Sequence, residues 1–309
     1  MRDTLGGDFP LFFFMAVNKP TYGGQALIEG VMIRGVNVVT MAVRHPTGDI
    51  VQRVDTLTIA SKNKARQIPF VRGVLILWEM LTIGTKALLW SASVASENEE
   101  GESEISGPAL WGTMALSLVF GISLFFVSPI LLTKLLDMVF HSTPLLSNII
   151  EGIVRLLVFV AYLWLINFVA EIRRVFAYHG AEHMTVHAYE NNQPLTVESI
   201  RHFNKAHPRC GTAFLLVVMV VSIIAFALLG DPSIYWRIAS RILLIPVITG
   251  ISYEIIRWSG RNASSSWVRF VTGPSLALQS LTTQWPDDDQ IEVAVAAMEH
   301  ALEEDSNAE

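Results

Sequence analysis

Residues 109–132 read ALWGTMALSLVFGISLFFVSPILL and contain no charged side chain. A helix needs about 20 mostly apolar residues to cross the hydrocarbon core of a bilayer, and this run is long enough. Three more segments pass the same test, although two of them contain ionisable residues: 149–170, 212–229 and 238–256. The sequence therefore predicts a mainly α fold, a polytopic helical membrane bundle of about four spans, with the lipid bilayer as its partner.

The composition of the whole chain agrees with a membrane protein. Of the 309 residues, 51% are hydrophobic and 16% are charged, and the mean hydropathy is +0.44. A typical soluble domain has about 25% charged residues. The net charge of −6 gives no indication of a nucleic-acid partner, and the single cysteine, Cys210, excludes an internal disulfide. The distribution of lysine and arginine predicts that the N-terminal region, the 171–211 segment and the C-terminus are cytoplasmic.

The other parts of the chain differ from the apolar segments in composition. Residues 36–43 and 50–57 flank a turn signal and are β-branched or alternate in polarity, which predicts a hairpin. Residues 70–92 are apolar but carry three charges, which are costly at the bilayer centre. The predicted organisation is a disordered or wrongly assigned start with Met15 as the true first residue (1–20), a small β-rich unit (21–68), an interfacial or re-entrant helix (69–92), an acidic linker (93–107), the membrane bundle with its His- and Glu-rich 171–211 segment (108–260), and an interfacial segment with a C-terminal amphipathic helix (261–309).

The residues that could carry chemistry lie between Tyr178 and Cys210. In a helix that continues from the second span, the spacing of His179, His183 and His187 places them in one stripe. Two imidazoles one turn apart can bind one metal ion at about 2.0–2.1 Å. The string His179-x-x-Glu182-His183 is also the inverzincin pattern, in which two histidines bind zinc and the glutamate activates water. We expect His179 and His183 to be metal ligands and Glu182 to be the catalytic base.

The sequence leaves the third metal ligand open. His187, His207 and Cys210 are competing candidates, and Glu254 is a more remote one. Histidine with a thiolate suits a divalent metal such as zinc, with iron and manganese left open. Two simpler interpretations stand beside the metal site: a polar packing or proton-handling network, and a hydrogen-bonded helix face without special chemistry.

Ionisable residues inside predicted spans are further candidates. Arg155, Arg241 and Glu254 are expected to be intramembrane polar partners, because such residues usually face a bundle interior or a cavity. For Arg241, pairing with an acidic group and snorkelling toward the interface remain equal alternatives.

Several stretches carry a family resemblance. They are GGQALIEGVMIRG at 23–35, YHGAEH at 178–183, HPRCGT at 207–212, GISYE at 250–254, LTT at 281–283 and PDD at 286–288. These stretches resemble the YqhQ-like family of bacterial membrane proteins, a domain of unknown function described as a predicted metal-dependent enzyme. The resemblance covers about residues 20–302 and implies a multi-pass protein of the bacterial inner membrane. Met184, where a lysine is expected, departs from the family pattern but lies off the histidine stripe.

The function we expect is a cytoplasm-facing, metal-dependent membrane hydrolase. The glycine-rich segment would add substrate contacts through Gln25, Glu29 and Arg34. One alternative is a non-enzymatic membrane scaffold or assembly factor that docks through the β unit and the C-terminal helix. A second alternative is a small proton-coupled transporter, with the ionisable residues of the spans lining its path. The metal content of the purified protein separates the enzyme from the scaffold.

Overall fold

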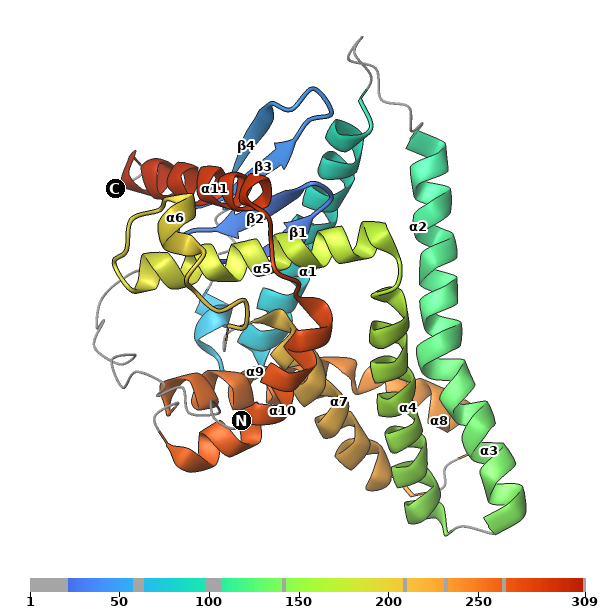
Figure 1. The fold of residues 1–309 in the computed structure, drawn as a ribbon. Helices are drawn as coiled ribbons and strands as arrows, with labels where there is room; N and C mark the ends of the chain where they lie inside the picture. The colour runs from blue at the N-terminus through green and yellow to red at the C-terminus, as the bar shows by residue number, and fades with distance from the viewer. Residues whose placement is uncertain are drawn as a thin grey trace, which may run out of the picture.

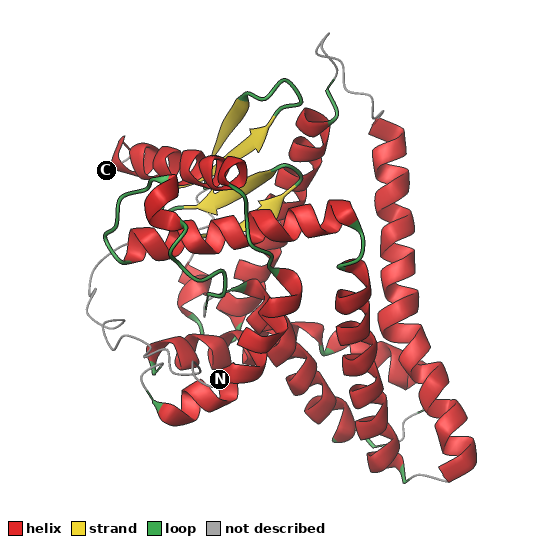
Figure 2. Cartoon of the chain, in the orientation of Figure 1, coloured by secondary structure: helices red, strands yellow, loops and turns green. Residues whose placement is uncertain are grey.

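The computed structural model describes residues 22–57, 64–97, 107–140, 143–207, 210–230, 233–262 and 265–307. A sheet flanked by helices forms one part of the molecule, and a bundle of apolar helices forms the other (Figure 1). All strands of the described residues belong to that one sheet (Figure 2). The predicted fold class, mainly α with a small N-terminal β unit, is confirmed. The expectation of a disordered or wrongly assigned start concerns residues 1–20, which lie outside the described residues.

The sheet has four antiparallel strands in chain order. β1 (Gly23–Leu27) pairs with β2 (Gly30–Arg34), and β3 (Val38–Arg44) pairs with β4 (Ile50–Thr56). The second hairpin is the one that the sequence predicts. The first hairpin comes from the glycine-rich segment, and its turn contains Glu29 in the left-handed region, with φ of 53°.

Helices cover both faces of the sheet (Figure 1). On one face, Val31, Ile33 and Ala42 pack against α5 (Ala170–Glu190) and α11 (Asp288–Asn307). Side chains alternate between the two faces of a strand, so neighbouring residues such as Met32 and Met41 point to the other face. The β unit is therefore not a separate body. We call the sheet, α5, α6 (Val197–Ile200) and α11 together the sheet lobe.

The helix expected at 69–92 is an uninterrupted helix of 25 residues, α1 (Val71–Ala95). It is long and apolar enough to cross a membrane. Its C-terminal half packs on the sheet, where Ala87 and Val94 are buried against the strands. Two of its charges are paired within the protein, Arg72 with Glu254 and Glu79 with Arg34. Because each of these two charges has a partner of opposite charge, placing it in a membrane costs less than placing an isolated charge there.

The helix bundle contains the apolar segments that the sequence identifies. α2 (Gly107–Ile122), the π-helical turn η3 (Ser123–Val127) and α3 (Ser128–Phe140) form one long helix, which is followed by α4 (Pro144–Ile166). Together with α1, these helices provide three described helices that are long and apolar enough to cross a membrane. α7 (Gly211–Ala227) is a shorter apolar helix that packs against α4. The chain therefore has the make-up of a polytopic membrane protein.

The expectation of one continuous span at 238–256 is wrong. The segment is divided at Leu244 into α8 (Ile234–Leu243) and α9 (Ile245–Arg261). Pro246 lies in the first turn of α9, and proline has no backbone N–H to donate to the carbonyl of the preceding turn. The proline therefore explains the interruption that the hydropathy pattern does not show.

The histidine segment is not a continuation of the second span. α4 ends at Ile166, and α5 starts at Ala170 and runs away from the end of α4 in a new direction (Figure 1). The side chain of Asn167 fixes the turn, because its Nδ2 donates to the carbonyl oxygens of Leu163 and Leu281, both at 2.7 Å. Long-range contacts thus set the direction of α5.

The C-terminal helix that the sequence predicts within residues 261–309 is present, and it closes the sheet lobe. α10 (Ser266–Thr282) packs on the bundle, and the chain then reaches α11, whose first turn carries reciprocal bonds between Asp287 and Gln290. Near its other end, the buried carboxylate of Asp305 accepts from the Tyr22 hydroxyl at 2.9 Å and from two backbone amides, of Val36 and Asn37, at 2.7 Å each. The apolar face of α11 therefore lies on the sheet.

We predict that Asp305→Ala destabilises the sheet lobe. The substitution removes the acceptor of three hydrogen bonds, and each buried donor left without a partner costs about 1–3 kcal/mol. Thermal unfolding of the detergent-purified protein should show an apparent midpoint several degrees lower than that of wild type. Glu303→Ala, at an exposed position of the same helix, is the control and should leave the midpoint unchanged. Equal midpoints for the two variants would contradict the role of Asp305.

Candidate metal centre

One face of α5 is both polar and buried. His183, Glu182 and His187 are 3%, 3% and 5% exposed, within a helix whose residues from Ala177 to Ala188 are nearly all buried. The ring centroids of His179 and His183 lie 4.4 Å apart, as their spacing of one turn predicts. The predicted histidine pair is therefore real, and it faces the protein interior.

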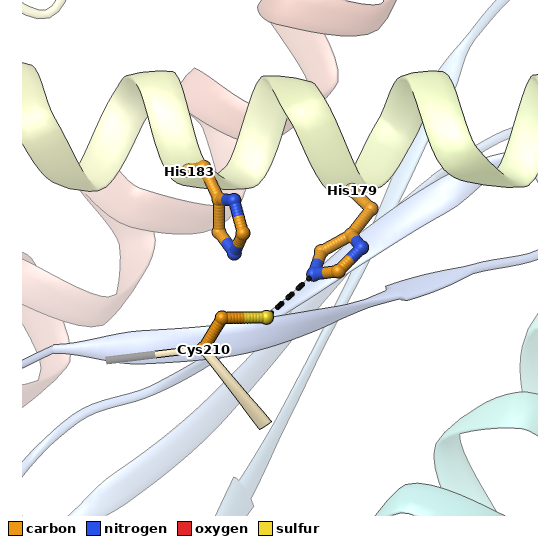
Figure 3. A group of neighbouring side chains, drawn as sticks. All are labelled: His179, His183 and Cys210. Carbon is orange, nitrogen blue, oxygen red and sulfur yellow. Dashed lines mark hydrogen bonds between the residues drawn. The ribbon is translucent and has the colours of Figure 1, made fainter. Parts of the chain in front are cut away.

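Cys210 completes a group of three possible metal ligands with this pair. The side chains of His179 and His183 point from α5 toward Cys210, which precedes α7 (Figure 3). One ligand atom of each residue lies within 4.8 Å of the other two, and His179 Nε2 is 3.2 Å from Cys210 Sγ. Thr212 donates to the same sulfur from its backbone N–H at 3.5 Å and from its hydroxyl at 3.3 Å. Of the three competing third ligands, Cys210 is the one that the structure groups with His179 and His183.

Backbone carbonyls fix the tautomers of both histidines. His179 Nδ1 is 2.8 Å from the carbonyl oxygen of Thr282, and His183 Nδ1 is 2.7 Å from that of Lys205. A carbonyl oxygen can only accept, so each Nδ1 carries a proton, and in the neutral imidazole each Nε2 keeps its lone pair. Metal-binding histidines in proteins usually donate their other N–H in this way. The two Nε2 atoms are therefore in the form that a metal ion requires.

Glu182 lies beside this group in a small cavity. One carboxylate oxygen, Oε2, is 3.5 Å from His183 Nε2. The cavity has a volume of about 40 Å³, which is enough for one or two water molecules. Its lining contains residues of α5, of the start of β1 and of the loop before α7: Tyr22, Gly23, Gly24, Glu182, His183, Val186, His207, Cys210 and Gly211. The predicted base therefore shares one cavity with three of the predicted ligands, His183, His207 and Cys210.

His187 and His207 do not join the first group. With Glu190 they form a second group, in which the ligand atoms again lie within 4.8 Å of one another. His207 Nε2 is 3.3 Å from Glu190 Oε2, and the rings of His187 and His207 are 4.4 Å apart. Burial lowers the pKa of His207, and the charge of Glu182 opposes this shift in part. Both histidines are thus corrected from third ligands of the first group to members of a neighbouring one.

The three residues expected to contact substrate are engaged elsewhere and do not line the cavity. Gln25 Nε2 donates to the carbonyl of Gly84 in α1, and Arg34 pairs with Glu79. Glu29 accepts from Arg174 at 2.5 Å and from the Tyr178 hydroxyl at 3.3 Å. Burial, followed by the charge of Glu29, raises the pKa of the Tyr178 phenol, and the hydrogen bond to Glu29 raises the pKa of Arg174. These contacts hold β1 and β2 to the helices around them.

The ionisable residues of the spans also lie apart from the cavity. Arg155 and Arg241 both pair with the buried carboxylate of Glu151, each at 2.7 Å, so Arg241 pairs with an acidic group and does not snorkel. Glu254 pairs with Arg72 on α1 and does not reach the histidines, which corrects its place as a remote metal ligand.

Comparison with known proteins gives two matches. Residues 68–304 match a family described as "Protein of unknown function (DUF1385)". The "Uncharacterized protein YqhQ" of Bacillus subtilis (strain 168) is 32% identical over 299 residues, which cover 92% of each chain. The chain belongs to the DUF1385 family. No solved structure matches the chain.

The DUF1385 match includes every ligand candidate on α5 and in the loop before α7 but begins after the sheet. It also includes a site residue that the sequence did not reveal. The fully buried Gln279 of α10 accepts from the His207 backbone N–H and donates to the His207 carbonyl, both at 2.9 Å. No local pattern marks Gln279, because its partner lies 72 residues away. Its two bonds fix the loop that presents Cys210.

We predict that Gly180→Ala disturbs the position of the histidine helix. A methyl group at this position would overlap the carbonyl oxygen of Gln284, in the segment that also supplies the Thr282 carbonyl to His179. The apparent midpoint of thermal unfolding should fall relative to wild type. Gly112→Ala is the matched control in another helix, where the added methyl has no neighbour within 4 Å, and it should be neutral or slightly stabilising. A Gly180→Ala protein as stable as the control would contradict the close contact between α5 and the Gln284 backbone.

Proposed function

We propose that this DUF1385 protein is a metal-dependent membrane hydrolase. In this proposal a divalent metal ion, zinc, is bound by His179, His183 and Cys210, and Glu182 is the general base. The observation that carries the proposal is the convergence of two Nε2 lone pairs and one sulfur beside a buried carboxylate.

The donor set fits zinc. Imidazole nitrogen and thiolate sulfur are common zinc ligands, and three protein ligands are the usual number in a catalytic site, where a fourth position stays open for water. Both imidazoles are in the required tautomer, and the Thr212 contacts hold the sulfur in place. Four separate elements supply these contacts: α5, the loop that contains Lys205, α7, which contains Thr212, and α10, which ends at Thr282.

The residues of the chain can perform the proton transfers of hydrolysis. A bound zinc ion would supply Lewis-acid chemistry, which lowers the pKa of water and polarises a scissile carbonyl or phosphoryl oxygen. The Glu182 carboxylate is positioned to accept a proton from a water molecule in the cavity and to return it to the leaving group. The substrate bond then breaks as the water oxygen attacks, and Glu182 ends in its starting form. His179 and His183 keep their Nδ1 protons throughout, because the carbonyls of Thr282 and Lys205 hold them.

The proposal includes a location. The three apolar helices support a membrane protein. We place it in the cell inner membrane as a multi-pass protein, with the sheet lobe and the 171–211 segment on the cytoplasmic side. The bias of basic residues supports this orientation, since Arg173, Arg174, Arg201 and Lys205 all belong to the lobe and its loops.

The test separates metal binding from proton transfer. His183→Ala removes a ligand, so the detergent-purified variant should contain less zinc than wild type by elemental analysis. Glu182→Gln keeps the ligands but cannot accept a proton, so it should retain the wild-type zinc content. Its hydrolysis of chromogenic ester, phosphoester and peptide probes should fall by about 10²–10⁴-fold relative to wild type.

Two exposed residues of the same lobe provide matched controls. His202→Ala and Glu198→Gln change the same residue types outside the cavity and should alter neither zinc content nor hydrolysis. Equal zinc content in wild type and His183→Ala would contradict the proposed metal centre. Loss of zinc in Glu182→Gln would instead make Glu182 a ligand and remove it as the base.

A further inference from the structure

The second group of side chains, His187, Glu190 and His207, is not needed for the proposed hydrolase. It occupies the next turn of the same helix, since residues 183, 187 and 190 are spaced by four and three positions. His207 reaches it from the loop before α7, with Nε2 at 3.3 Å from Glu190 Oε2. Ligand atoms of all three residues lie within 4.8 Å of one another. Two helical residues and one loop residue thus meet, as they do in the first group.

The tautomer of His187 suits a ligand role. Its Nε2 is 2.9 Å from the carbonyl oxygen of Ala206, so Nε2 carries the proton and Nδ1 keeps the lone pair. The carbonyls of consecutive residues, Lys205 and Ala206, therefore orient one histidine of each group. Gln279 holds the next residue of the same loop, His207, through its backbone. One loop conformation thus organises both groups.

The two groups adjoin the same hollow. The rings of His183 and His207 are 5.8 Å apart, and both residues line the cavity together with Glu182 and Cys210. The donor sets differ in character: the first has two imidazoles and a sulfur, and the second has two imidazoles and a carboxylate. A two-histidine, one-carboxylate set binds divalent first-row metals such as zinc and iron(II).

We propose that His187, Glu190 and His207 form a second divalent-metal position next to the first one. The centre is then binuclear, with one sulfur-containing position and one carboxylate-containing position that share the cavity. This inference goes beyond the proposed function, which requires only the first position. It assigns Glu190 a ligand role that the HxxEH pattern on α5 does not suggest.

Metal stoichiometry tests the second position. Full-length protein in detergent is stripped with a chelator, reloaded with excess zinc, desalted and analysed for zinc per chain. Wild type should contain two zinc ions per chain, and Glu190→Gln should contain one. Cys210→Ser should also contain one, because it affects only the first position. Glu198→Gln, an exposed glutamate of the same lobe, should keep two.

Cobalt(II) identifies which position is lost. A thiolate bound to cobalt gives a ligand-to-metal charge-transfer absorption, and of the two groups only the first contains a cysteine. Glu190→Gln should keep this absorption while losing one metal ion, and Cys210→Ser should lose the absorption while keeping one ion. One ion in wild type, kept by Glu190→Gln and lost by Cys210→Ser, would overturn the second position and leave the proposed function intact. One ion in wild type, lost by Glu190→Gln and kept by Cys210→Ser, would overturn the first position and leave the second. A wild-type protein without metal would overturn both positions.

Discussion

The hydrogen bonds from the α5 imidazoles to backbone carbonyls are the contacts on which the rest of the structure depends. α5 is buried although it carries a polar face, and a buried donor without a partner costs about 1–3 kcal/mol. The partners of His179 and His183 are the carbonyls of Thr282 and Lys205, which lie on segments adjoining α10 and α7. α5 can therefore be buried in the sheet lobe only when these segments of the bundle are in place. α5 therefore couples the lobe to the bundle, and α1, which packs on both the sheet and α9, is a second connection between them.

Local sequence patterns predicted the parts of the molecule that depend on contacts between residues close together in the sequence. The β3–β4 hairpin follows from its turn signal, and the facing of His179 and His183 follows from the helical repeat. The direction of α5 could not be predicted, because Asn167 fixes the preceding turn by bonding to Leu281, 114 residues further along the chain. The sequence also did not show that Cys210, and not His207, lies in one group with His179 and His183. This grouping depends on the path of one loop, and a contact of Gln279 with His207 fixes that path.

The partners of charged residues in apolar segments could not be predicted from local sequence patterns either. Sequence reasoning assigns each charge its own insertion penalty, and on that basis α1 was expected to be interfacial. In the folded chain, Arg72 of α1 pairs with Glu254, which lies 182 residues away. Glu151 likewise serves two arginines, Arg155 one turn along α4 and Arg241 on α8. Removing one member of such a group would leave an uncompensated buried charge, so the helices that carry these residues are held in a defined arrangement.

The proposed metal site and a simple packing network satisfy the atoms of the first group in different ways. A proton on Cys210 would satisfy the sulfur and His179 Nε2, which lie 3.2 Å apart. His183 Nε2 and Glu182 Oε2 lie 3.5 Å apart, and either a proton on His183 or a positive ion beside the pair would satisfy both atoms. A second proton on His183 would serve that pair alone, whereas a divalent ion at the centre of the group would serve both imidazoles and the sulfur and attract the carboxylate. The metal ion of our proposal would therefore be one partner for atoms that a packing network has to satisfy pair by pair.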